Sequence, residues 1–393
     1  MIPYENFSFF ALLLIPLAPA VLLGLLGING RIRAMWLLLS TLGMLWIVYK
    51  PLISLVQVLA FFLWGYILIR GFLAFKQSER AKDSKLFQPV YFMAVAGSIL
   101  PLVLVKLNPY LSATGIWNTP IGFLGISYLT FRIVGTVIEI RDGLIKEIKL
   151  PDFTLYVLFF PTLASGPIDR YRRFLEDLHK PLARKAYTEL LGEGIHLIFR
   201  GLFYKFIVAY LINRYALAPL SEATGIAATV KYMYAYSFYL FFDFAGYSAF
   251  AVGTGYLLGV KTPQNFNQPF LARNIKDFWN RWHMSLSFWF RDYIYMRFVL
   301  DSAKKKRFKN RYTSAYLGYL LLFGIMGVWH GTQLNYIVYG FYHAALMIGF
   351  DWLERKNKSR RFWGQGWLWS IAEIVITAHF VFFGFLIFSG RLG

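Results

Sequence analysis

The chain contains no cysteine among its 393 residues. That absence excludes a disulfide framework, a thiolate metal site, palmitoylation and a cysteine nucleophile. Acidic residues are also few, because 20 Asp and Glu stand against 41 Lys and Arg, which gives a formal net charge of +21. The basic residues lie in short clusters between apolar segments. This pattern indicates cytoplasmic loops and anionic lipid headgroups more than nucleic-acid binding.

Sequence motifs of nucleotide hydrolysis and of serine hydrolases are missing. No G-x-x-x-x-G-K-[ST] loop occurs, so we expect the energy for any reaction to arrive in an activated substrate. No Gly-x-Ser-x-Gly sequence occurs either, and Ser165 in LASGP indicates a turn. The histidines and carboxylates show no metal-ligand spacing of the H-E-x-x-H kind, so the sequence predicts no metal site.

Long apolar segments dominate what is present, with 58% hydrophobic and 20% aromatic residues. They predict an all-α polytopic membrane protein of about 10–12 transmembrane helices plus re-entrant or interfacial helices, in a single domain over residues 1–393. The ten expected crossings are residues 7–28, 34–49, 52–75, 89–107, 121–140, 187–212, 227–258, 312–329, 336–352 and 366–388. Two apolar but interrupted stretches, 153–167 and 279–300, are expected to be re-entrant or interfacial.

The distribution of Lys and Arg predicts the orientation of the protein in the cell membrane. Basic clusters follow the expected spans at residues 31–33, 76–85, 141–149, 170–185, 304–311 and 355–361, and these loops should be cytoplasmic. Loops around residues 50, 108–120 and 331–335 carry one basic residue or none and should lie outside, as should the N-terminus. The first six residues include Glu5 and no Lys or Arg, so we expect the first span to remain uncleaved.

Two of the six histidines are candidates for catalysis. His330 lies in GVWHG, where one span ends a few residues before the next begins, and His283 lies in the interrupted segment FWNRWHMS. An ionisable side chain at such a depth is costly and is a functional candidate by default. A structural role remains open, because histidines often cap helices or bond to carbonyl groups.

The other four histidines have simpler explanations. His343, on an apolar helix, is expected to pack or to form a hydrogen bond, with a supporting role left open. His179 and His196 are expected at the membrane interface, and His379 in the core. A neutral histidine without an evident serine partner suits a general base that acts on a substrate hydroxyl.

Several sequence blocks occur in a fixed order along the second half of the chain. They are FFDFAGYS (241–248), QNFNQPF (264–270), FWNRWHMSLS (278–287), WFRDY (289–293) and WHG (329–331). In this order they resemble the membrane-bound O-acyltransferases. GISYLTF (125–131) and FPTLASGPIDRY (160–171) narrow the resemblance to the branch of Gram-positive bacteria that D-alanylates teichoic acids. The alginate O-acetyltransferase branch shares the central blocks and is the alternative.

The resemblance implies transfer of an acyl group from a thioester to a hydroxyl. His330 then corresponds to the residue that the family treats as catalytic, here a general base, and His283 to a supporting group that orients substrate or polarises the carbonyl. Asn280, Arg281 and Asn335 are candidates to hydrogen-bond the substrate, and a structural role is the alternative for each of them. The chain would bind no cofactor permanently.

The resemblance also implies the partners. The donor would be a D-alanyl thioester on the phosphopantetheine arm of a small acidic cytoplasmic carrier protein. The acceptor would be a teichoic acid, or the side chain of a small membrane partner, on the outer side. An acidic carrier suits a basic surface with an apolar patch, which the sequence offers at Phe298, Val299, Leu300, Lys304 and Lys305. A helix that binds lipid headgroups would have the same composition.

Two other classes of function remain open from the sequence. A transporter or flippase of a cell-wall intermediate would also be basic, polytopic and rich in aromatic residues. It predicts that His330→Ala leaves thioester transfer intact. A scaffold for a cell-wall complex predicts that neither histidine matters for activity. The ordered sequence blocks favour the acyltransferase.

Overall fold

The computed structural model describes residues 1–113, 115, 122–360, 363–364 and 366–392. Three sequence predictions therefore fall partly outside the described residues. These are residues 114 and 116–120 of the predicted outer loop 108–120, the first residue of the predicted span 121–140, and Arg361 of the last basic cluster.

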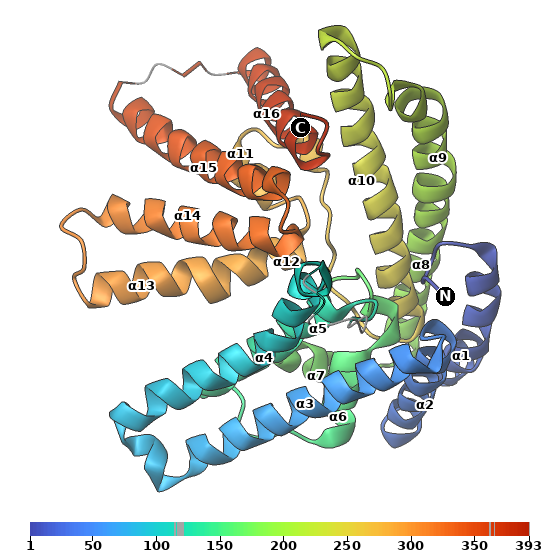
Figure 1. The fold of residues 1–393 in the computed structure, drawn as a ribbon. Coiled ribbons are helices and arrows are strands. Elements are labelled where there is room, and N and C mark those ends of the chain that lie inside the picture. Colours follow the sequence, from blue (N-terminus) through green and yellow to red (C-terminus); the bar gives the residue numbers. More distant parts are fainter. Residues whose placement is uncertain (114, 116–121, 361–362, 365, 393) are drawn as a thin grey trace. The chain divides into compact units, whose positions relative to one another are not determined.

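The described residues form helices and no strands (Figure 1). The helices are α1 Phe7–Leu25, α2 Arg31–Val48, α3 Leu52–Gln77, α4 Ser84–Ala113, α5 Ile126–Arg141, α6 Leu150–Leu158, α7 Tyr171–His179, α8 Arg184–Leu202, α9 Tyr210–Ile212, α10 Ile226–Leu257, α11 Ile275–Trp279, α12 Met284–Phe290, α13 Met296–Lys304, α14 Arg311–His330, α15 Leu334–Arg360 and α16 Trp367–Phe388. Short 3₁₀ segments lie at Glu79–Lys82, Phe160–Thr162, Ala218–Leu220 and Pro269–Leu271, and π-helical segments at Phe203–Ala209, Asn213–Leu217 and Arg291–Tyr295.

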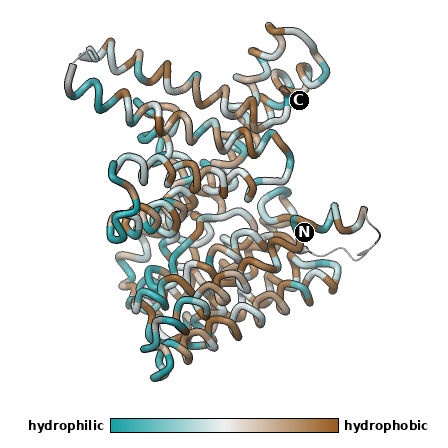
Figure 2. Tube along the Cα trace, turned by 60° about the vertical axis from the view of Figure 1, so that its left-hand side comes forward, coloured by the Kyte–Doolittle hydropathy of each residue, from teal (hydrophilic) through white to brown (hydrophobic). Residues whose placement is uncertain are grey.

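The all-α, multi-pass architecture predicted from the sequence is confirmed. Seven helical segments of the described chain are long and apolar enough to cross a membrane: Phe7–Leu25, Arg31–Val48, Leu52–Gln77, Lys85–Ala113, Arg184–Leu220, Tyr312–His330 and Trp367–Phe388. Hydrophobic residues run along these helices, and hydrophilic residues collect at several turns (Figure 2). The three other predicted crossings are helices α5, α10 and α15, which are shorter or more polar than a simple span, so the number of ten crossings stays a prediction.

The chain divides into two compact units. The first comprises Met1–Arg200 and Tyr247–Pro263, and the second comprises Gly201–Gly246 and Gln264–Gly393. The chain passes between them within α8, within α10 and after Pro263. The prediction of a single domain stays a prediction, and the units are described one at a time.

In the first unit, α5 is the central helix and packs against α3, α4, α6 and α7. Every residue of α5 from Tyr128 to Ile140 is buried, including Arg132, which is 1% exposed. Its guanidinium donates hydrogen bonds to the carbonyl oxygens of Tyr156, Val157 and Thr162 at 3.0, 2.7 and 2.9 Å. These carbonyls lie where α6 ends and the chain turns, so a buried arginine stabilises the interrupted stretch 153–167.

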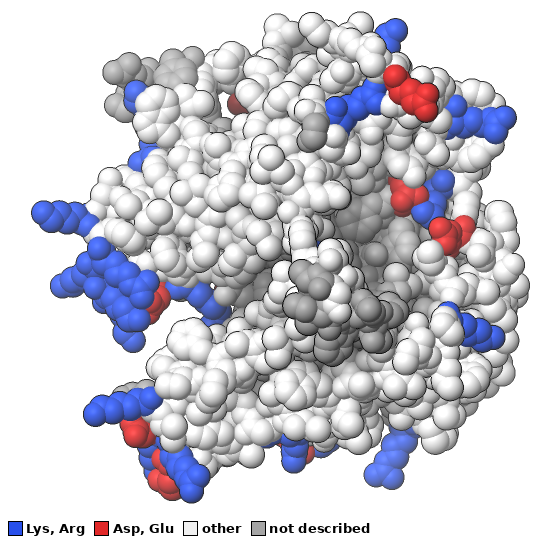
Figure 3. Space-filling view, viewed as in Figure 1, with Lys and Arg blue, Asp and Glu red and all other residues white. Residues whose placement is uncertain are grey.

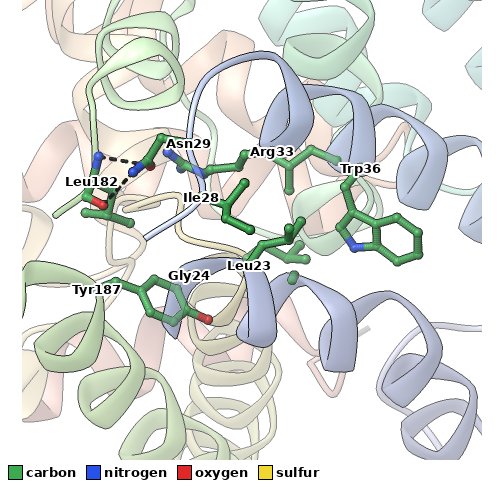
Figure 4. A pocket seen from close by; sticks show the side chains of 11 residues that line it. Leu23, Gly24, Ile28, Asn29, Arg33, Trp36, Leu182 and Tyr187 are labelled. Carbon is green, nitrogen blue, oxygen red and sulfur yellow. Dashed lines mark hydrogen bonds between the residues drawn. The ribbon is translucent and has the colours of Figure 1, made fainter. Parts of the chain in front are cut away.

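The turn between α1 and α2 is fixed to the segment before α8 in the same unit. The Asn29 side chain donates to the Leu182 carbonyl at 2.9 Å and accepts from the Leu182 amide at 3.1 Å (Figure 4). Arg33, predicted as part of a basic loop, is instead buried and donates to the carbonyl of Gly259. The hollow at this turn measures only about 10 Å³, so it is a packing feature rather than a ligand site.

In the second unit, α14 and α15 form a hairpin, and α13 packs against α14 while α16 packs against α15. Glycines allow the hairpin helices to approach closely. A Cβ atom on Gly340 would lie 2.3 Å from the Phe323 carbonyl oxygen, and one on Gly327 would lie 2.6 Å from the Tyr336 carbonyl oxygen. The short helix α11 contacts α15 and α16, which positions the turn that follows it.

Candidate functional site

His283 lies in the turn between α11 and α12, in an unusual backbone conformation. Its φ of 43° and ψ of 50° fall in the left-handed region, which non-glycine residues rarely occupy. The imidazole is 5% exposed and meets the Phe244 ring edge to face at 4.8 Å between centroids. A strained residue held in place at a buried turn is a common feature of functional sites.

Two asparagines that the sequence reasoning did not single out hold this turn. The Asn265 carbonyl accepts from the Met284 amide at 2.9 Å, and its side-chain oxygen accepts from the Ser285 hydroxyl at 2.6 Å. The backbone amide of Asn267 donates to the Arg281 carbonyl at 2.9 Å. Asn265 in QNFNQPF was the available signal, because a buried amide side chain needs hydrogen-bond partners, whereas the exposed Asn267 contributes only its backbone.

His330 is the last residue of α14, at the tip of the hairpin with α15. Its half-buried ring lies 5.0 Å from the Phe388 ring and 6.0 Å from the Tyr339 ring, both edge to face. The turn that follows is crowded, because a Cβ atom on Gly331 would lie 2.3 Å from the Tyr336 ring. The WHG sequence therefore ends the helix with the imidazole held among aromatic rings.

The two histidines open into the same cavity in the second unit. It measures about 80 Å³ and is lined by Leu240, Phe244, Trp279, Trp282, His283, Leu286, Met326, His330, Tyr339, Phe385 and Phe388. No carboxylate, lysine or arginine occurs in this lining. The cavity thus offers two imidazoles as proton-transfer or hydrogen-bonding groups in otherwise apolar surroundings.

A larger cavity adjoins it in the same unit. It measures about 200 Å³ and is lined by Lys276, Trp279, Asn280, Ser287, Phe288, Phe290, Arg291, Tyr295, Tyr319, Leu322, Phe323, Met326 and Met347. Trp279 and Met326 line both cavities, so they form the wall between them. The polar and basic groups of the larger cavity are therefore separated from the histidine cavity by the side chains of Trp279 and Met326.

Lys276 in this larger cavity belongs to an ionic network that fixes α11. Its ammonium lies 2.9 Å from Asp351 and 2.8 Å from Glu354, both on α15. Burial alone would lower the pKa of Lys276, but the hydrogen bonds to Glu354 and Asp351 outweigh it and raise this pKa. Lys276 therefore keeps its positive charge at neutral pH, beside the histidine turn.

The predicted substrate-binding residues do not line the histidine cavity. Asn280 lines the larger cavity. Arg281 pairs with Asp277 at 2.7 Å, and Asn335 donates to the Phe388 carbonyl at 2.8 Å, which fixes the end of α16. Within the described chain, no group of three or more His, Asp or Glu lies close enough to hold a metal ion.

The predicted carrier-docking residues lie in the last turns of α13 and just beyond. Leu300 is 60% exposed, Lys304 and Lys305 are exposed, and Phe298 is half-buried. Val299 packs toward α14, since its methyl group would lie 3.3 Å from a Cβ on Gly318. Basic side chains gather at this turn between α13 and α14 (Figure 3). Asp301 pairs with Lys305 and Arg307 at 3.0 and 2.6 Å and neutralises part of that charge.

The FFDFAGYS block contributes a further ion pair that the sequence reasoning did not assign. Asp243 accepts from Lys205 at 2.5 Å, and a Cβ on Gly246 would lie 2.8 Å from the Lys205 side chain. Lys205 belongs to the π-helical segment Phe203–Ala209. On the neighbouring face of α10, Leu240 and Phe244 line the histidine cavity.

The sequence matches one protein family and is similar to several curated proteins. Residues 29–390 match the membrane-bound O-acyltransferase family. The chain is 49% identical to the teichoic acid D-alanyltransferase of Bacillus subtilis (strain 168), over 100% of this chain and 98% of the relative. It is 41% identical to that of Lacticaseibacillus rhamnosus, over 99% and 97%. A probable alginate O-acetylase of Pseudomonas putida is 30% identical over 64% of this chain and 50% of its own length. This multi-pass helical chain therefore belongs to the membrane-bound O-acyltransferase family.

Proposed function

We propose that the protein transfers a D-alanyl group from a carrier-protein phosphopantetheine thioester to a hydroxyl on the outer side of the cell membrane, for the D-alanylation of teichoic acids. The observation that carries the proposal is the single small cavity into which His283 and His330 both open. The near-full-length similarity to two teichoic acid D-alanyltransferases supports the choice of acyl group.

The reaction needs little from the protein beyond a base, positioning and stabilisation of an oxyanion. The His330 imidazole takes the proton of the acceptor hydroxyl as its oxygen attacks the thioester carbonyl. The carbon–sulfur bond breaks, an oxygen ester forms, and the proton passes to the departing thiolate. His283, buried beside the same cavity, orients the substrate or donates to the carbonyl oxygen.

The donor and acceptor would approach from opposite sides of the membrane. The exposed basic turn with Leu300, Lys304 and Lys305 suits a small acidic carrier protein. The larger cavity, with Lys276 and Arg291 in its lining, offers room for the carrier's slender arm next to the histidine cavity. Asn280 in that lining is a candidate hydrogen-bonding residue for the arm. The acceptor, a teichoic acid or a small membrane partner, would enter from outside.

Substitution of His330 tests the proposal. Purified protein in lipid, supplied with a D-alanyl-loaded carrier and a hydroxyl acceptor, should transfer the acyl group, and His330→Ala should slow transfer by roughly two to four orders of magnitude. His196→Ala is the matched control, because His196 is exposed on α8. Radiolabelled D-alanine in the ester product measures the rate, and monodispersity in detergent checks folding. A folded His330→Ala protein with full activity would contradict the role of the base.

The alternative acyl group is acetyl, which the similarity to a probable alginate O-acetylase keeps open. The same assay with an acetyl donor separates the two. Wild-type protein that accepts the acetyl donor and rejects the D-alanyl carrier would favour exopolysaccharide O-acetylation. Transfer of the D-alanyl group alone would exclude it.

The proposed orientation, with the N-terminus outside, can be tested because the chain has no cysteine. We expect Ile2→Cys, at a position that is 50% exposed, to react with a membrane-impermeant maleimide added to intact cells. Lys305→Cys in the basic turn should react only after the membrane is opened. The reverse labelling pattern would require the opposite orientation.

A further inference from the structure

The wall between the two cavities of the second unit contains polar atoms that bond to no described residue. The indole Nε1 of Trp279 is buried and has no hydrogen-bond partner among the residues described. The same holds for both ring nitrogens of His343, a side chain that is 0% exposed. An unsatisfied buried polar group costs about 1–3 kcal/mol, so three such atoms in one place require an explanation.

His343 lies directly behind the rings that line the cavities. Its ring is 5.1 Å from the Trp279 ring and 4.6 Å from the Tyr339 ring, both edge to face, and 6.1 Å from the Phe323 ring. Phe323 lines the larger cavity, Tyr339 lines the histidine cavity, and Trp279 lines both. His343 therefore contacts rings that line both cavities, although its own side chain lines neither.

The fold makes room for this imidazole. A Cβ atom on Gly384 of α16 would lie 2.7 Å from the Nε2 atom of His343. Any larger residue at position 384 would therefore press on the ring. A phenylalanine or leucine could satisfy a purely apolar packing position at 343, because no described residue pairs with the ring nitrogens.

We propose that Trp279 and His343 form a hydrogen-bonding station for an amide group of the acyl donor's arm, at the point where the arm passes from the larger cavity to the histidine cavity. The inference rests on the proposed function, which supplies a donor whose arm contains amides. A secondary amide has one donor and one acceptor. The Trp279 N–H donates to its carbonyl oxygen, and the neutral imidazole of His343 accepts from its N–H.

We infer that entry of the arm displaces the Trp279 indole, because this side chain lines both cavities and contacts the His343 ring edge to face, whereas His343 itself lines neither cavity. Trp279 and His343 are positioning residues for the donor, and the reaction at the thioester is unchanged.

Donors with and without an amide test the station. D-alanyl-loaded carrier and D-alanyl-S-N-acetylcysteamine both carry an amide next to the thioester arm, whereas the D-alanyl thioester of ethanethiol carries none. For His343→Phe and Trp279→Phe we expect KM to rise about 5- to 10-fold for the two amide-bearing donors, since each variant loses one hydrogen bond. For His343→Phe, which alters a residue that lines neither cavity, kcat should change little, and the amide-free thioester should react as well as with the wild type.

His343→Gln provides the conservative variant, because its side-chain amide also accepts a hydrogen bond, and it should restore KM to within about twofold of wild type. His196→Phe, at an exposed position, is the matched control. An equal loss with all three donors, or no change in KM with any of them, would overturn the station. Wild-type protein that uses none of the D-alanyl donors would contradict the proposed function itself, and the station with it.

Discussion

At the scale of single residues, the site depends on a histidine whose backbone is strained and whose neighbours hold it. His283 occupies the left-handed region, and Asn265 contacts both residues that follow it. A left-handed conformation costs about 1–3 kcal/mol at a non-glycine residue and persists only when the surroundings enforce it. The hydrogen bond between Ser285 and Asn265 is therefore part of what places the imidazole.

We expect Asn265→Ala and Ser285→Ala each to lower the rate of acyl transfer by roughly tenfold and to destabilise the fold by about 1–3 kcal/mol. Both variants remove the same 2.6 Å hydrogen bond, so the double variant should lose little more than either single one. Transfer rates and thermal unfolding midpoints of the wild type, the two single variants and the double variant measure the coupling between Asn265 and Ser285. Strictly additive losses would show that the bond does not act as a unit.

The two histidines could be predicted as site residues from the sequence, because an ionisable side chain next to apolar segments that enter the membrane is recognisable from those segments. Asn265 could not be predicted in the same way, because its role depends on a contact with a residue 20 positions further along the chain. Asn335 shows the opposite case. The sequence analysis named it as a substrate-binding candidate, but in the structure its side-chain amide donates to the Phe388 carbonyl, and its substrate role stays a prediction.

At the scale of elements, the packing of the α14–α15 hairpin determines the position of the catalytic candidate His330. His330 is the last residue of α14, and the two helices approach at Gly340 without space for a side chain. Some helix ends predicted from apolar runs were close to those observed, as for 52–75 against Leu52–Gln77, whereas the predicted span 336–352 ends well before α15 does at Arg360. The breaks inside segments were harder to place, because α12 continues through a π-helical segment into α13 where the sequence suggested only an interruption.

Gly340→Val should therefore separate the hairpin helices. The added Cβ meets a backbone carbonyl oxygen at 2.3 Å, which no side-chain rotation can relieve, and overpacking of this kind costs about 1–3 kcal/mol or more. We expect a lower unfolding temperature and a reduced kcat, because the helix that carries His330 must shift.

Gly349→Ala on the same helix is the control, since nothing lies within 4 Å of its added Cβ. Replacing this helical glycine should be neutral or should stabilise by about 0.4–1 kcal/mol. If Gly340→Val matched Gly349→Ala in both unfolding temperature and activity, the close approach of the hairpin would have no functional importance.

At the scale of the whole molecule, positive charges exceed negative ones by 21, and one group of basic side chains gathers at the turn between α13 and α14 (Figure 3). The turn after α13 combines exposed Lys304 and Lys305 with an exposed Leu300. Opposite charges raise the rate of association between proteins and are screened by salt. A carrier protein and a lipid headgroup would both respond to this charge, so the assay must separate them.

We expect Lys304→Glu combined with Lys305→Glu to raise KM for the D-alanyl carrier at least tenfold and to weaken the salt dependence of that KM. The KM for D-alanyl-S-N-acetylcysteamine, which needs no protein docking, should stay the same. Lys85→Glu, at an exposed position in the first turn of α4, serves as the control. Equal effects on both donors would point to a general disturbance of the membrane-facing structure.

The Arg132 contacts have a consequence for biosynthesis. An arginine at the centre of a helix entering the bilayer costs about 2.5–3.5 kcal/mol during insertion. In the finished protein its guanidinium binds carbonyls that are synthesised 24 to 30 residues later. We therefore expect a nascent chain that ends at Asp142 to leave α5 incompletely inserted, and one that ends at Pro167 to integrate it. Glycosylation sites placed after each end point would report the difference, and equal insertion of both chains would contradict it.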